Sequence, residues 1–427
     1  MNQQGEDMAG NSDNSSNTKK TGAAAVLHGE VKARTFHPGV HILGGMGNTT
    51  AFETDQGYVL IDAGFNKGMA ASFMQALQEI KAAPIHSIVY SHGHGGYNNA
   101  AWYFQEMARE RGEPAPQIVA HENLPLRYQR YDETWQLQNY LNSMQFRMSS
   151  DGLGKPRHTY PTVTFQDSLR LNLGNRVIEV IWAPSETDDS VAVWLPDEKV
   201  LYTGPAVIAA CINIGTPLRT QRDDKRWVKT LENFAALEPE LLIPNFGKIV
   251  KGKDEIQFML NNMAEGLRYL RREVTERMNR HMTDVEILHD IEYPAEYFEQ
   301  PWSAPLYGCP DMIVRDIYRS ENGWWDRNPT NLHPAQPGEA ASAVLAAISD
   351  RKAVLDKAES LLDAGEVQLA LHVIDILALA PDDDDDVKAA KKLKSKLLHL
   401  RSENVPSIVS TNLYLSLADA LDKELES

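Results

Sequence analysis

The chain has 427 residues, of which 42% are hydrophobic and 24% are charged, and its formal net charge is −17. Such values are ordinary for a globular protein of two or three domains, so a wholly disordered chain, a collagen-like repeat and a disulfide scaffold are excluded. The acidic balance argues against binding to nucleic acid, because phosphate backbones repel a negative surface. No apolar run approaches the roughly 20 residues of a membrane span, which predicts a soluble protein without a membrane partner. The chain has only two cysteines, which suits a cytoplasmic location.

The order of elements along the chain predicts two folded domains. Residues 1–28 are rich in Asn, Ser, Gly and Gln and lack the apolar centre of a secretory signal, so we expect a disordered leader. Short β-type runs then alternate with helical stretches, which is typical of an α/β domain, and we place this domain at residues 29–282. Residues 283–427 have apolar residues at helical spacing and include a helical hairpin around the turn at 363–366.

Three expected strands and one expected helix lead to the most polar part of the first domain. The strands are predicted at residues 40–43, 58–61 and 87–90, and the helix at 69–81. The third strand ends at the polar segment 91–99, and active sites in layered α/β folds favour such strand ends. Further strands are expected at 162–165, 169–173, 176–182, 191–195, 199–203 and 240–243, and helices at 122–146, 226–237 and 253–282.

Two histidines in this polar segment suggest a metal site. His92 and His94 are separated by one residue at the end of an apolar strand, so their side chains project to the same side and can reach one ion. Gly93 and Gly95 let the backbone turn closely around a bound ion and contribute no core packing. A surface His-x-His without function is the alternative.

The Ser-His-x-His motif, preceded by Leu-Ile-Asp-Ala-Gly at 60–64, resembles the metallo-β-lactamase superfamily, whose signature is His-x-His-x-Asp-His. Residues 183–189, Ala-Pro-Ser-Glu-Thr-Asp-Asp, resemble the Glu-bearing metal loop of its alkylsulfatase-like branch. Residues 323–334 resemble the dimerisation domain of that branch. The resemblance implies an α/β fold, a four-layer αββα sandwich, followed by an all-helical dimerisation domain, and therefore a homodimer.

The chain departs from the family at the ligands of the second metal. Gly96 and Tyr97 stand where the signature has its aspartate and its second histidine. Pro205 stands where a Thr-Gly-Asp turn supplies a bridging acid, and Phe246 stands in place of a late histidine. None of these residues is a good metal ligand, so the two-metal centre of the family is not expected here.

One set of ligands survives, namely His92, His94 and Glu186. Two histidines and a carboxylate form a catalytic zinc site that leaves one position open for water or substrate. We expect one divalent ion, Zn²⁺ in the first place, with Fe and Mn as alternatives. Such an ion would lower the pKa of water and polarise a bound oxygen, which suffices for hydrolysis of an ester or lactone. The alternative is a relic loop whose histidines only form hydrogen bonds.

Five neighbouring residues are further candidates for the site. Tyr97 could act as a general acid or orient a substrate, or its ring could fill the space of the lost ion. Asp188 and Asp189 could supply a general base or a replacement ligand, or face solvent. Asn98 and Asn99 could bind a substrate by hydrogen bonds, or form a turn.

A loop after the lost acid position carries Asn213, Arg219 and Arg222. In the relatives this loop approaches the site. Its arginines are therefore candidates for recognition of a sulfate, phosphate or carboxylate group, and we expect all three residues to bind substrate.

Three functions remain open on the sequence alone. The first is a one-metal hydrolase of an ester-like small molecule, such as a sulfate ester, thioester, phosphoester or lactone. The second is a remodelled pocket for non-hydrolytic chemistry, with a redox metal or no metal. The third is a non-catalytic dimeric binding protein with a decayed site. One complete ligand set is lost while the other is intact, and this selectivity favours a remodelled site over random decay.

Overall fold

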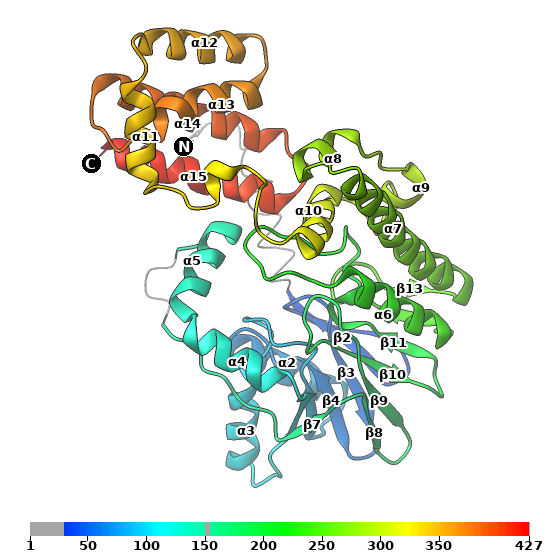
Figure 1. Ribbon diagram of the computed structural model, residues 1–427. Helices are drawn as coiled ribbons and strands as arrows, with labels where there is room; N and C mark the ends of the chain where they lie inside the picture. Colours follow the sequence, from blue (N-terminus) through cyan, green and yellow to red (C-terminus); the bar gives the residue numbers. More distant parts are fainter. Residues whose placement is uncertain (1–29, 150–153, 427) are drawn as a thin grey trace, which may run out of the picture.

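The computed structural model describes residues 30–149 and 154–426 (Figure 1). The leader expected at 1–28 lies outside these residues. Two β-sheets pack face to face, helices cover their outer faces, and a group of helices follows towards the C-terminus (Figure 1). The expected αββα sandwich followed by an all-helical region is therefore confirmed. Within the described ranges, no helix combines the length and apolar character needed to cross a membrane.

The first sheet contains seven strands, which follow each other in sequence order. The pairs from β1 to β4 are antiparallel, and those from β4 to β7 are parallel. Parallel neighbours require crossover connections, which are supplied here by helices. The strands are β1 (Val31–His37), β2 (Val40–Gly44), β3 (Thr49–Thr54), β4 (Gly57–Ile61), β5 (Ile85–Val89), β6 (Gln117–His121) and β7 (Val163–Phe165). The helices are α2 (Lys67–Ile80), α3 (Ala101–Glu110), α4 (Leu124–Glu133) and α5 (Trp135–Phe146).

The second sheet has the strand order β13-β12-β11-β10-β9-β8. Its neighbours are antiparallel except for β11 and β12, which are parallel and joined through helix α6. The elements are β8 (Ser168–Asn172), β9 (Val177–Trp182), β10 (Val191–Leu195), β11 (Val200–Tyr202), η1 (Gly204–Ala206), α6 (Asp224–Ala236), β12 (Leu241–Ile243) and β13 (Val250–Lys251).

Apolar side chains fill the three spaces between the four layers. Val59 of β4 and Val193 of β10 belong to the cluster between the sheets, and both are fully buried. Phe73 of α2 packs on the outer face of the first sheet, and Trp227 of α6 on that of the second. The outer helical layer continues through α7 (Lys253–Asn279), α8 (Asp284–Asp290), α9 (Ala295–Phe298) and α10 (Pro310–Asn322).

The last helices form a cluster with its own apolar core, and α15 attaches this cluster to the sandwich (Figure 1). Asn412 of α15 donates a hydrogen bond to the Gln145 carbonyl of α5 at 2.8 Å. Asp419 of α15 forms an ion pair with Arg147 at 2.6 Å. The elements are η2 (Pro329–Asn331), α11 (Pro337–Ala346), α12 (Arg351–Asp363), α13 (Val367–Ala378), α14 (Asp385–Glu403) and α15 (Ile408–Glu426).

A buried aspartate joins the carboxyl ends of β4 and β5. Asp62 directly follows β4 and accepts hydrogen bonds from the Ser91 amide (2.8 Å), the Ser91 hydroxyl (2.6 Å) and the Asn98 amide group (2.9 Å). Its side chain is inaccessible to water, and this burial raises the pKa of the carboxyl group to about 6, although the hydrogen bonds act in the opposite direction.

Asp62 should therefore make stability depend on pH. Its pKa is higher in the folded protein than in the unfolded chain, so its contribution is full below pH 4 and is lost as the pH rises through 6. We expect the unfolding free energy of the wild type minus that of Asp62→Asn to fall by about 2.4 kcal/mol between pH 4 and pH 7. Urea unfolding at several pH values measures this difference.

The control for this prediction is Asp197→Asn, at an exposed turn between β10 and β11. Because the side chain is exposed, this substitution should change the unfolding free energy by less than about 0.5 kcal/mol. If the difference in unfolding free energy between the wild type and Asp62→Asn stays constant or increases with pH, folding does not raise the pKa of Asp62.

Candidate metal site

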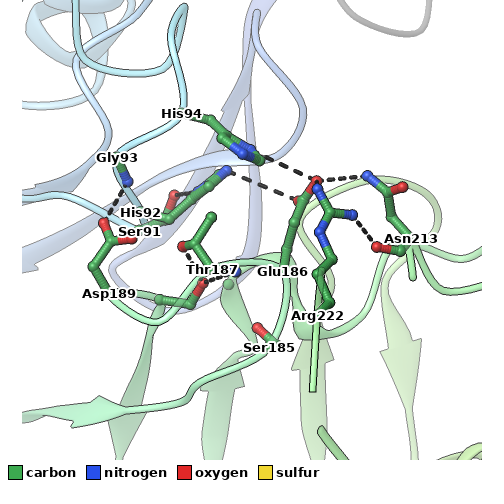
Figure 2. Close-up of polar contacts among 12 residues, drawn as sticks. Ser91, His92, Gly93, His94, Ser185, Glu186, Thr187, Asp189, Asn213 and Arg222 are labelled. Carbon is green, nitrogen blue, oxygen red and sulfur yellow. Dashed lines mark hydrogen bonds and ion pairs between the residues drawn. The ribbon is translucent and has the colours of Figure 1, made fainter. Parts of the chain in front are cut away.

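Three side chains from two loops converge at the edge where the two sheets meet (Figure 2). His92 and His94 follow β5 of the first sheet, and Glu186 lies between β9 and β10 of the second. His92 Nε2 is 4.0 Å from Glu186 Oε2, and His94 Nδ1 is 3.6 Å from Glu186 Oε1. One possible ligand atom from each residue lies within 4.8 Å of the others, so the three can surround a single ion.

The hydrogen bonds of His92 leave one ring nitrogen available. The Ser91 hydroxyl donates its hydrogen to Asp62, so it accepts a hydrogen bond from the N–H at His92 Nδ1, at 2.8 Å. His92 Nε2 therefore carries a lone pair, and among the described residues it has no hydrogen-bond partner although it is buried. A metal-binding histidine usually donates its other ring N–H to a fixed acceptor, and here the Ser91 hydroxyl, itself held by Asp62, is that acceptor. The residues therefore fit a metal ion.

Both histidines are held in the neutral form that binds metal. Burial lowers the pKa of His92 to about 4, and the nearby Glu186 only partly offsets this effect. Burial also lowers the pKa of His94 well below its ordinary value, and His92 and the arginines act in the same direction. Neither ring needs to lose a proton at neutral pH before it binds an ion.

Asn213 and Arg222 hold the carboxylate of Glu186. Glu186 Oε1 accepts hydrogen bonds from Asn213 Nδ2 at 2.5 Å and from Arg222 Nη2 at 3.0 Å (Figure 2). Arg222 also donates to the Asn213 carbonyl, and its own amide donates to Asp316 of α10 at 3.0 Å. The Arg222 side chain is only 3% exposed. The contacts thus favour a role in orienting the ligand over the substrate binding expected from the sequence.

Tyr97 packs against the metal ligands. Its ring lies 4.3 Å from the His92 ring and 6.4 Å from that of Phe246, and its side chain is buried. Two residues that we expect at ligand positions of a second metal are thus in contact with each other. Burial raises the pKa of the Tyr97 phenol well above its ordinary value, so the group stays protonated. The geometry favours the interpretation of Tyr97 as a ring that fills the space of the lost ion.

Asn98 and Asn99 stabilise the loop that carries the histidines. Asn98 is buried, donates to Asp62, and accepts a hydrogen bond from the Ala63 amide at 3.0 Å. Asn99 Oδ1 accepts from the Gly96 amide at 3.3 Å. These contacts favour turn formation, the second of the two interpretations.

Asp188 and Asp189 both form ion pairs with Arg127 of α4. Asp189 is fully buried, and it accepts hydrogen bonds from the Gly93 amide at 2.6 Å and from Arg127 Nε at 2.5 Å. Asp188 is 54% exposed and forms an ion pair with Arg127. These contacts favour a structural role for the two aspartates over the expected catalytic one.

Arg219 is the remaining candidate for binding an anionic substrate. It is half-buried, and Asn142 of α5 accepts a hydrogen bond from its Nη2 at 2.7 Å. Tyr307, from the loop before α10, lies near Glu186, and its hydroxyl accepts a hydrogen bond from Gln145 of α5 at 2.5 Å. No local motif marks Asn142, Gln145 or Tyr307, because the first two reach the site only through the packing of α5, and Tyr307 only through the packing of the loop before α10.

Comparison with known proteins agrees with this architecture. Residues 42–245 match the family model of the metallo-β-lactamase superfamily, and residues 283–424 match that of the alkyl sulfatase dimerisation domain. The chain is 26% identical over 396 residues to a linear primary-alkylsulfatase of Pseudomonas sp. (strain ATCC 19151), and it is 27% identical over 267 residues to an (R)-specific secondary-alkylsulfatase of Pseudomonas sp.. These alignments cover 88% and 61% of this chain.

A solved structure has the same fold. The chain matches the stereoselective inverting sec-alkylsulfatase Pisa1 from Pseudomonas sp. with a TM-score of 0.78 and 23% identity over 92% of its own length. It spans 74% of the primary alkylsulfatase, 38% of the secondary alkylsulfatase and 65% of Pisa1. With both of its domains matched in this order, the chain belongs to the alkylsulfatase-like branch of the metallo-β-lactamase superfamily.

Proposed function

We propose that this protein hydrolyses the sulfate ester of an alkyl alcohol, and that His92, His94 and Glu186 hold a single divalent ion, in the first place Zn²⁺. The primary and secondary alkylsulfatases among its relatives support the sulfate ester as the substrate class. The observation that carries the metal site is the buried His92 Nε2, which faces Glu186 and has no hydrogen-bond partner among the described residues.

The packing around the site supports one ion in place of two. The Tyr97 ring packs against His92 and the Phe246 ring against Tyr97, and both residues stand at sequence positions where the family has further ligands. Pro205 is buried in η1 and has no donor atom on its side chain. The Arg222 guanidinium beside Glu186 adds a fixed positive charge that a second cation nearby would have to overcome.

The chain's own residues divide the work of ester hydrolysis between them. A divalent ion, when bound, would polarise the ester and lower the pKa of a water molecule. The neutral rings of His92 and His94 offer lone pairs, and Asn213 and Arg222 fix the orientation of Glu186. Arg219 is oriented by Asn142 and can donate two parallel hydrogen bonds to sulfate oxygens.

A metal-free binding pocket is the second candidate. One observation favours it, namely that Asn213 and Arg222 already satisfy Glu186 Oε1 without an ion. The dimerisation domain supports a homodimer. We also propose a cytoplasmic location, since Cys211 and Cys309 are both free thiols.

Metal content distinguishes the two candidates. The purified protein, reconstituted with Zn²⁺, should retain about one equivalent, and His92→Ala should retain less than about a tenth of that amount, because the remaining ligands cannot form the three-ligand site. Mass spectrometry of the dialysed protein for metals measures both values. His333→Ala, at an exposed position of the helical region, is the control and should bind like the wild type. Metal-free wild type would refute the first candidate, and full occupancy of His92→Ala would show that the ligands are misassigned.

Substrate recognition is tested at Arg219. Loss of a charge-assisted hydrogen bond costs about 1.5–3 kcal/mol, so Arg219→Ala should lower kcat/KM for a linear primary alkyl sulfate by about 10- to 100-fold. Sulfate release under steady-state conditions measures this value. The control is Arg170→Ala, whose exposed side chain pairs with Glu179. No sulfate release by the metal-loaded wild type would refute the proposed reaction, and unchanged kinetics of Arg219→Ala would refute only the role of this residue.

The oligomeric state can be measured independently of activity. We expect light scattering coupled to size exclusion to give twice the mass of the chain at micromolar concentration, since residues 283–424 match a dimerisation domain. A single species with the mass of one chain would contradict the dimer.

A further inference from the structure

One buried carboxylate connects the two loops that carry the proposed metal ligands. Asp189 lies three residues after Glu186 in the second loop. Its Oδ2 accepts a hydrogen bond at 2.6 Å from the amide of Gly93, which lies between His92 and His94 in the first loop (Figure 2). The single carboxylate therefore links the histidine pair to the chain segment that carries the third ligand.

A second hydrogen bond, on the other side of His92, joins the histidine loop to the start of β10. The Val191 amide donates to the Ser91 carbonyl at 2.8 Å. The residues before and after His92 are thus bonded to Val191 and to Asp189, which both lie close to Glu186 in the sequence. The backbone of His92 is held at two points, and this restricts how far its ring can move relative to the Glu186 carboxylate.

Arg127 anchors Asp189 to a rigid element of the fold. Arg127 lies on α4, and its Nε donates to Asp189 Oδ1 at 2.5 Å. Leu124 and Tyr128 of the same helix are buried in the core that covers the first sheet. The carboxylate is therefore fixed through a charged hydrogen bond to a packed helix, and its position does not depend on the loops alone.

The space around Gly93 leaves little freedom for this arrangement. A Cβ atom at Gly93 would lie 2.7 Å from Arg127 Cδ and 3.0 Å from Asp189 Oδ2, which is closer than normal contacts allow. A Cβ atom at Gly95, by contrast, would meet no atom within 4 Å. Glycine is therefore required by the packing at residue 93 and is not required by packing at residue 95.

We propose that Asp189, locked by Arg127, is a positioning residue that sets the distance between the histidine pair and Glu186, and so determines the affinity of the site for its metal ion. This inference rests on the proposed one-metal function. The neighbouring Asp188 also forms an ion pair with Arg127, but its side chain is 54% exposed. We therefore assign the positioning role to Asp189 and not to Asp188.

Two matched pairs of variants test this role. Asp189→Asn cannot accept hydrogen bonds from both Gly93 and Arg127, since its amide NH₂ would face one of the two donors. Gly93→Ala pushes the same groups apart without a change of charge. Residues that support metal ligands contribute about 10- to 100-fold to the affinity for the metal, so both variants should raise the Kd for Zn²⁺ by that factor. Asp188→Asn and Gly95→Ala are the matched controls and should keep the Kd of the wild type. Competition with a chelator measures these values.

Hydrogen exchange of the metal-free protein provides a second readout. Amide exchange of the peptide spanning residues 91–99 should be faster in Asp189→Asn and Gly93→Ala than in the wild type, while exchange in the strands of the second sheet stays unchanged. The two control variants should exchange like the wild type. Faster exchange throughout the protein would show a general loss of stability and would overturn the specific role.

The outcomes separate this inference from the proposed function. If Asp189→Asn and Gly93→Ala have the same Kd for Zn²⁺ and the same exchange in residues 91–99 as their control variants, Asp189 has no positioning role. If the wild type binds no Zn²⁺, the proposed one-metal function fails and so does the effect on affinity. Exchange then decides whether Asp189 holds the histidine loop.

Discussion

The hydrogen-bonded series Asp62, Ser91 and His92 is the interaction on which the candidate site depends. It directs the proton of His92 to Nδ1 and leaves the Nε2 lone pair facing Glu186. It also ties the end of β4 to the end of β5, so the same contacts that complete the first sheet define the ligand. A buried carboxylate of this kind destabilises the fold when it is charged, and hydrogen bonds to three donors limit that cost.

Two arginines balance carboxylates close to the two histidines. Arg222 balances the charge of Glu186, and Arg127 balances that of Asp189. Both guanidinium groups are largely buried, where an unpaired charge would be costly, so the pairs form only if the loops adopt one arrangement. Pairs of this kind add little net stability, but they specify geometry. This explains how a site built mainly on loops is held in one arrangement.

The sequence predicted those parts of the protein that local patterns determine. Apolar runs bounded by turn residues predicted β4 and β5. The Ser-His-x-His motif and the Glu-bearing segment 183–189 predicted the group of His92, His94 and Glu186. The helix expected at 122–146 is divided into α4 and α5, and the threonine-rich β3 was not predicted, because its pairing with β2 and β4 comes from the sheet. The pairs of Arg127 with Asp189 and of Arg222 with Glu186 connect residues 62 and 36 positions apart, and no local pattern encodes such contacts.

The charges of the site give a reason why an acidic chain can still act on an anion. The net charge of −17 is spread over the whole molecule, whereas the carboxylates next to the histidines are each paired with an arginine. Exposed charges more than about 10 Å away are screened at ordinary ionic strength, so the local balance determines what the site attracts. With Glu186 and Asp189 balanced, Arg219 and a divalent ion at the ligands would leave the site positive. A sulfate ester carries one negative charge at neutral pH, so it matches the site better than a neutral lactone does. In the proposed function, the replacement of the second ligand set by uncharged residues would change the number of ions and would still leave a site that favours an anionic substrate.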